Sequence, residues 1–267
     1  MPDPFAVFLS SPTLLGVPYR WRFGVIKSLG FDGAEVLLTT SAIRWWNGGL
    51  GVMYSGLPQI TFHRWWGGPE LSARILEGLH AFPRSGVRLR DVLAQDFPFQ
   101  VVLSTYTWEE RTDVQHILIQ PTCTSQDPEN MMSFETMRQE ISGYRLAFDP
   151  MHWLQYKHWP QAMPAEPQAL LSATVEDFHS LQEQIDEIHI YDFIPSQKGG
   201  VLGCNLFPGD GVFPVRPFLK AVCDSGWRGR IVWEIHPIVI LKNLWRPRWL
   251  ERQLKNLPIL THEIFNE

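Results

Sequence analysis

The chain has 267 residues and a formal net charge of -5, from 23 basic and 28 acidic side chains. Hydrophobic residues make up 45% of it and charged residues 19%, which excludes an intrinsically disordered chain and provides for a sizeable core. Because the balance is acidic and no basic block stands out, we expect no nucleic-acid partner.

Neither a targeting segment nor a membrane span is indicated. The opening stretch MPDPFAVFLSSP lacks the basic region and the apolar length of a signal peptide. No apolar run reaches the roughly 18 residues that a membrane helix needs. Cys123, Cys204 and Cys223 share no CxxC spacing, which indicates a reducing compartment. We therefore expect a cytoplasmic protein; the sequence carries no signal for an oligomeric state.

Short apolar or β-branched runs recur along the chain, and most are apolar enough for strands buried on both faces. They are residues 6–10, 34–38, 59–63, 99–104, 116–120, 145–149, 187–192 and 230–234. Helical patterns lie between them, with Ser133 as an N-cap and Gly30 and Gly226 as C-caps. We expect helices at residues 20–29, 69–81, 86–95, 133–142, 172–184, 214–225 and 247–256.

Eight strands that alternate with helices predict an α/β fold, a single (β/α)8 TIM barrel that forms one domain over residues 1–267. An open doubly wound sheet is the alternative, but SSPTLLG after the first strand is not its Gly-rich phosphate turn. Segments 39–57 and 193–213 are rich in Gly and Pro, and we expect them to be loops at the carboxyl ends of the strands.

Polar residues gather where the predicted strands end. They are Glu35, His63, Gln120, Asp149 followed by His152, His189 with Asp192, and Glu234. A lone residue of this kind is usually structural, but a barrel would bring all of them to one mouth. There the carboxylates of Asp149 and Glu234 would repel each other, and a divalent cation is the simplest compensation.

The ligand types narrow the choice of ion. Carboxylate oxygens with imidazole nitrogens suit Mn²⁺, Zn²⁺, Fe²⁺ or Co²⁺ rather than Ca²⁺, and the missing thiolate argues against a structural zinc site. Glu35, His63, Trp65 and Trp153 are candidates for substrate contact, with structural hydrogen bonding or packing under loops as the alternative. Asp192 is expected to orient His189 or a neighbouring backbone.

Several segments resemble the xylose-isomerase-like barrels, a superfamily that includes sugar-phosphate isomerases, ketose 3-epimerases and endonuclease IV. They are LGFDGAEVL (29–37), FDPMH (148–152), EIHIYD (187–192) and residues 206–237. The last segment is the most specific, because a GDG turn, a helix and Gly-Trp-x-Gly lead into a strand that ends in Glu234. The resemblance covers about residues 25–237 in strand order.

In the sugar epimerases of this superfamily, Glu, Asp, His and Glu from successive strands hold one metal ion. The resemblance implies that Asp149, His189 and Glu234 are three of these ligands, and that His152 contacts substrate hydroxyls beside the metal. Gln120 stands where the first Glu is expected. Its amide oxygen can bind a metal but cannot take a proton, so Glu234 would act as the one base.

These observations predict a metal-dependent isomerase or epimerase that acts on a small sugar or polyhydroxylated carbonyl compound. Glu35 or His63 could supply the first metal ligand instead of Gln120. The alternatives are a catalytically weakened barrel that binds a sugar or a partner protein, and a metal-dependent hydrolase. An endonuclease IV-like site would need further ligands, which Ser104 at the end of strand four and FIPSQKGG after Asp192 do not supply.

Overall fold

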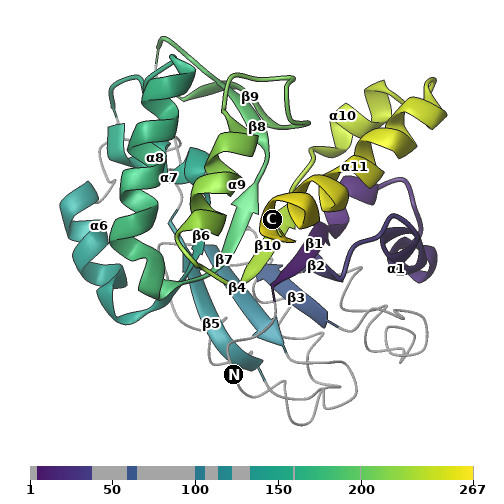
Figure 1. Cartoon of the computed structure of the whole chain (residues 1–267), viewed down its shortest axis with the longest axis horizontal. Coiled ribbons are helices and arrows are strands. Elements are labelled where there is room, and N and C mark those ends of the chain that lie inside the picture. Colours follow the sequence, from purple (N-terminus) through teal and green to yellow (C-terminus); the bar gives the residue numbers. More distant parts are fainter. Residues whose placement is uncertain are drawn as a thin grey trace, which may run out of the picture.

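The computed structural model describes residues 5–37, 59–64, 100–105, 114–121, 133–158, 160–198 and 200–266. Its centre is a curled sheet whose strands are hydrogen-bonded in the closed order β1-β10-β7-β6-β5-β4-β3-β2 (Figure 1). The strands are β1 (Ala6–Ser10), β2 (Gly33–Leu37), β3 (Gln59–Arg64), β4 (Gln100–Thr105), β5 (Val114–Gln120), β6 (Arg145–Phe148), β7 (Ile185–Ile190) and β10 (Arg230–Trp233). All eight predicted strands are therefore present.

The predicted all-parallel barrel is wrong at one strand, because β4 runs antiparallel to both β3 and β5. Residues 106–113 are the whole connection between β4 and β5. A parallel crossover needs about a dozen residues or more, so this connection is too short for one. The reversal places Gln100 opposite Gln120, whereas Ser104 pairs with Thr61 at the other end of the strands. The fold is thus α/β with a curled, mainly parallel sheet.

The helices lie outside the ring of strands, with α6 to α9 on the side of β6 and β7, α11 beside β1, and α1 on the side of β2 (Figure 1). They are α1 (Tyr19–Ser28), α6 (Phe134–Glu140), α7 (Pro150–His158), α8 (Pro167–Leu181), α9 (Val215–Asp224), α10 (Pro237–Lys242) and α11 (Pro247–Asn266). The predicted helices 69–81 and 86–95 lie outside the described residues. Helices α7 and α10 were not predicted, although each begins with a proline, which favours the first helical position.

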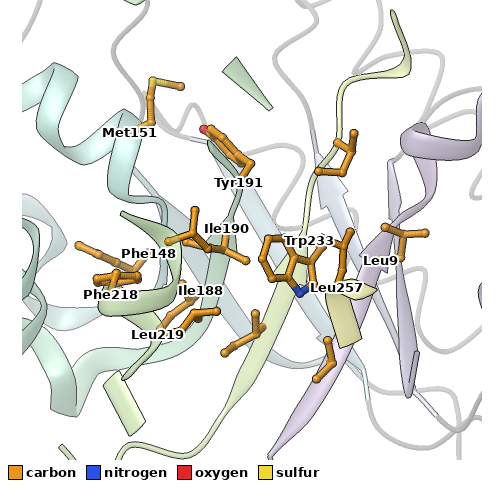
Figure 2. Close-up of a cluster of buried hydrophobic side chains, with 14 of the residues drawn as sticks. Leu9, Phe148, Met151, Ile188, Ile190, Tyr191, Phe218, Leu219, Trp233 and Leu257 are labelled. Carbon is orange, nitrogen blue, oxygen red and sulfur yellow. The ribbon is translucent and has the colours of Figure 1, made fainter. Parts of the chain in front are cut away.

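Side chains alternate between the two faces of each strand. The outward set packs against the helices and forms the main core, part of which Figure 2 shows. That part includes Leu9, Phe148, Ile188, Ile190 and Trp233 from the strands and Phe218, Leu219 and Leu257 from the helices. Inside the ring, Phe8 lies so close to Gly33 that a Cβ there would come within 2.4 Å of its ring. Glycine at this position lets Phe8 fill the interior below the site.

The segment 193–213, predicted as a loop, contains most of an antiparallel hairpin formed by β8 (Asp192–Pro195) and β9 (Val201–Leu206). In Figure 1 the hairpin rises beyond the end of β7. Its register shifts twice, which explains why the sequence shows no clean alternation there. The hairpin brings residues from beyond β7 back over the carboxyl ends of the strands.

Two further expectations concern the membrane and the cysteines. Among the helices that the structure describes, none is long and apolar enough to cross a membrane. Cys204 and Cys223 are free thiols, and Cys123 lies outside the described residues.

Candidate metal and substrate site

The polar side chains of the site lie near the carboxyl ends of the strands, on the face of each strand that points into the ring. In five strands a small or apolar inward residue is followed two positions later by a polar one, as a period of two requires. The pairs are Phe8 and Ser10, Gly33 and Glu35, Leu118 and Gln120, Ala147 and Asp149, and Val232 and Glu234. The same spacing in β3 gives Thr61 and His63. The sequence therefore builds a polar layer that lies above small or apolar residues in these five strands.

Four residues of this layer form a tight cluster: Glu35, His63, His189 and Glu234 each offer a ligand atom within 4.8 Å of the others. His63 Nδ1 lies 3.2 Å from Glu35 Oε2 and 3.6 Å from Glu234 Oε1. His189 Nε2 lies 3.3 Å from Glu35 Oε2, and its Nδ1 lies 3.3 Å from Glu234 Oε1. Each imidazole therefore faces both carboxylates.

The contacts within the cluster shift the pKa values of His63, His189 and Glu234 toward their charged forms. Burial opposes a charge on His63, but the carboxylates of Glu35 and Glu234 outweigh it and raise the pKa of His63 to about 10. Burial is likewise outweighed at His189, whose pKa the same carboxylates raise well above its usual value. The pKa of Glu234 is held well below its usual value, because both imidazoles outweigh the effect of burial. These directions favour charged imidazoles beside an ionised Glu234.

A second charged layer lies below His189. The Glu187 carboxylate is 2.8 Å from His189 Nε2 and accepts a 2.9 Å hydrogen bond from Arg230 Nε. Burial alone would raise the pKa of Glu187, but His189 and Arg230 together lower it. Neither Glu187 nor Arg230 was singled out in the sequence. Glu187 lies two positions before His189 and Arg230 four positions before Glu234, so the period of two places both on the face that points into the ring.

Asp149 and Gln120, two of the predicted metal ligands, contact each other beside this cluster. Gln120 Nε2 lies 3.3 Å from Asp149 Oδ2 and 3.3 Å from His189 Nδ1. Asp149 also accepts hydrogen bonds from the Tyr191 hydroxyl, at 3.0 and 2.8 Å, and from the His152 backbone N–H, at 3.0 Å. Each of its two oxygens therefore has at least one hydrogen-bond donor within reach.

Tyr191 was not singled out in the sequence, although it follows His189 at the inward period of two. Burial and the negative charge of Asp149 raise its pKa well above the usual value, so the phenol remains a donor. In Figure 2 its hydroxyl points away from the centre of the core, on the side of Met151. Tyr191 thereby fixes the orientation of the Asp149 carboxylate.

Two other predicted residues lie away from the cluster. Trp153 is only 2% exposed and packs edge-on to Phe134 in the helical core, so it does not face the pocket. Asp192 does not contact His189 by hydrogen bond; its carboxylate accepts four backbone N–H groups, from Phe193, Gly209, Gly211 and Phe213. It thus organises the neighbouring backbone, which was the other predicted role. Trp65 lies outside the described residues.

The hairpin adds Asn205, which the sequence did not reveal. Its backbone has a φ of 53°, in the left-handed region that few residues other than glycine adopt. Its Nδ2 donates to Glu234 Oε2 at 3.2 Å, and its carbonyl accepts from the His236 N–H at 2.8 Å. The strained backbone therefore directs an amide at the carboxylate that is expected to act as base.

A cavity of about 590 Å³ opens over this layer. Its polar part includes His63, Gln120, His152, Asn205 and Glu234. The remaining described lining residues are Ser10, Pro12, Thr13, Leu15, Leu37, Met151, Cys204, Ile235, His236, Pro237, Ile238 and Leu241. The volume lies within the usual range of small-molecule sites.

The residues present fit a divalent cation. Gln120 Oε1 is a buried acceptor without a hydrogen-bond partner, whereas Glu35 Oε2 contacts imidazole nitrogens of His63 and His189 at 3.2 and 3.3 Å. Unpartnered buried oxygens are costly unless a cation compensates them. Two carboxylates and two imidazoles form a donor set that suits Mn²⁺, Fe²⁺, Co²⁺ or Zn²⁺.

No protein-family model matches the chain, and no curated protein matches it. Several solved structures do match the chain. A xylose isomerase domain protein from Alicyclobacillus acidocaldarius aligns at 14% identity over 98% of this chain and 100% of that chain, with a TM-score of 0.58. A D-tagatose 3-epimerase-like protein aligns at 14% identity over 98% of each chain, with a TM-score of 0.52. A xylose isomerase domain-containing protein from Salmonella typhimurium LT2 aligns at 12% identity over 98% of each chain, also with a TM-score of 0.52. The predicted resemblance is thus confirmed as a shared fold.

Proposed function

We propose that this chain, which has the fold of the xylose-isomerase-like superfamily, is a metal-dependent enzyme of the isomerase type. Its substrate would be a small polyhydroxylated carbonyl compound, such as a sugar or a sugar derivative. The observation that carries this proposal is the buried cluster of Glu35, His63, His189 and Glu234, two of whose members, His63 and Glu234, line the cavity. Buried acid–base residues that converge under a pocket are typical of active sites.

His189 and Glu234 belong to both candidate sets of metal ligands. Asp149 and Gln120 complete the set that the family resemblance implies, and Glu35 and His63 complete the cluster. The hydrogen bonds that engage Asp149 favour the second pair, because Asp149 would have to give up donors to bind an ion. A bound divalent ion would polarise a substrate carbonyl oxygen.

Glu234 is our candidate for the base. It is the one carboxylate among the described residues that line the cavity, and its side chain is 17% exposed. Its lowered pKa keeps it ionised at neutral pH, and a carboxylate must be ionised to accept the proton from the carbon next to the carbonyl. Gln120 cannot accept a proton, so proton transfer on a single face, as in isomerisation, fits better than epimerisation with two bases.

His152 would bind substrate hydroxyls. It lines the cavity, and its Nδ1 is buried without a hydrogen-bond partner. A buried polar atom that faces a pocket and lacks a partner is ready to bind a polar group of a ligand.

Deuterium exchange tests the proposed chemistry. The protein loaded with Mn²⁺ or Co²⁺ should exchange the C–H proton next to the carbonyl of at least one member of an aldose and ketose panel in D2O, as seen by NMR. Glu234→Gln should abolish this exchange, whereas Glu251→Gln, which changes an exposed carboxylate on α11, should not. Retained exchange in Glu234→Gln would refute the role of Glu234 as base.

A catalytically weakened barrel is the second candidate, and the amide of Gln120 favours it. In that case the wild-type protein would bind a sugar without proton exchange. Gln120→Glu would then restore both metal affinity and exchange, because it supplies a carboxylate beside Asp149 and His189. Exchange that is present in the wild type and lost in Gln120→Glu would exclude this candidate.

A further inference from the structure

The cavity is polar on its floor and apolar on one wall. Leu15, Ile238 and Leu241 line this wall and are 62%, 49% and 50% exposed. They are three of the nine large hydrophobic side chains that are exposed among the described residues. An exposed apolar cluster that adjoins a polar site indicates a ligand-binding surface.

Helix α10 has one face in the core and another that forms part of this wall. Ile240 packs into the main core, while Ile238 and Leu241, three positions apart, share the face toward the cavity. Leu15 follows the short 3-10 helix η1 (Ser11–Leu14) and lines the same cavity. The apolar wall is therefore made by two elements that follow β1 and β10.

The wall is held in place before any ligand binds. Thr13 Oγ1 accepts a 3.2 Å hydrogen bond from the Ile235 N–H, which ties η1 to the segment before α10. His236 caps α10, because its Nδ1 accepts from the Ile238 N–H at 3.1 Å. A preformed apolar surface gains binding free energy from a ligand without an ordering cost.

We infer that the substrate is amphipathic: its oxygen-bearing end faces the Glu/His cluster, and an alkyl or aryl substituent lies against Leu15, Ile238 and Leu241. The substrate class is then a hydroxycarbonyl compound or sugar derivative that carries an apolar group, rather than a sugar that is hydroxylated along its whole length. This inference rests on the proposed function, because the polar end is placed by the metal site.

Alkyl hydroxamates test the inference, because the hydroxamate group chelates divalent metals and the chain length can be varied. Calorimetry on the metal-loaded full chain would compare acetohydroxamate with hexanohydroxamate, which has four more methylenes. At a factor of two to about four per methylene, hexanohydroxamate should bind at least about 16-fold more tightly. Ile238→Asn should remove most of this gain. Ile259→Asn is the matched control, since Ile259 is 51% exposed on α11 and lies outside the cavity lining.

The outcomes separate the two proposals. Equal affinity for both hydroxamates, or the same gain in Ile238→Asn and in Ile259→Asn, would overturn the amphipathic substrate while leaving the metal site intact. Failure of acetohydroxamate itself to bind would refute the metal site, and the inference that depends on it would fall with it.

Discussion

Asn205 has a left-handed backbone conformation, and its side-chain amide donates a hydrogen bond to Glu234, the candidate base. At a φ of 53° most side chains cost about 1 kcal/mol or more, and glycine costs none. We therefore expect Asn205→Ala to lower the thermal stability of the protein, and Asn205→Gly to leave it unchanged or raise it. Both variants lose the hydrogen bond to Glu234, and both should lose about 10- to 100-fold in metal affinity or activity.

Thermal unfolding and metal titration of the two variants check this prediction together. The glycine variant separates the two roles, because it relieves the backbone while removing the amide. If Asn205→Gly kept its full metal affinity and activity, Asn205 would be a turn residue only.

Among the elements, the connection between β9 and α9 depends on one carboxylate. Each oxygen of Asp192 accepts two backbone N–H groups, and a Cβ at Gly211 would come within 2.4 Å of Asp192 Oδ1. Asp192→Asn would turn an NH2 group toward two of these donors. We expect the free energy of unfolding to fall by about 2 kcal/mol or more, measured by denaturant unfolding.

Asp210→Asn is the control for this prediction. Asp210 lies in the same turn but is exposed, so its change should cost about 0.5 kcal/mol or less. A similar cost for both variants would show that the N–H bonds to Asp192 contribute little to stability.

Across the whole molecule, the ionised cluster links stability to pH. The folded-state pKa of His63 is raised to about 10 from an ordinary value of 6.5. A raised histidine pKa stabilises the fold fully below its unfolded pKa, and this contribution is lost as pH rises through the folded value. Metal-free protein in EDTA should therefore lose melting temperature between pH 6.5 and about 10.

His63→Gln should flatten this pH dependence, whereas His179→Gln, which changes an exposed histidine on α8, should not. Melting curves across this pH range are the measurement. Identical pH profiles for the wild type and His63→Gln would contradict the charged state assigned to the cluster.

The sequence predicted the strands and the polar layer because both follow from a period of two and from buried apolar runs. It named Glu35 and His63 as substrate contacts and as alternatives to Gln120 for the first metal ligand, and it did not predict that both would cluster with His189 and Glu234, because the depth of a side chain inside the ring depends on register between distant strands. The reversal of β4 could have been predicted from the sequence, since residues 106–113 are too few for a parallel crossover. The position of Asn205 in the site could not be predicted, because the register shifts of its hairpin remove the periodic signal.

The most direct test of the central claim is the metal content of the purified protein, measured by elemental mass spectrometry for the wild type, Glu234→Gln, Glu35→Gln and Asp149→Asn. We predict about one equivalent of a transition metal in the wild type and its loss in Glu234→Gln. A greater loss in Glu35→Gln than in Asp149→Asn would identify the cluster as the ligand set, and the reverse would favour the set that the resemblance implies. A wild-type protein without metal, even after incubation with Mn²⁺ and Zn²⁺, would contradict the account.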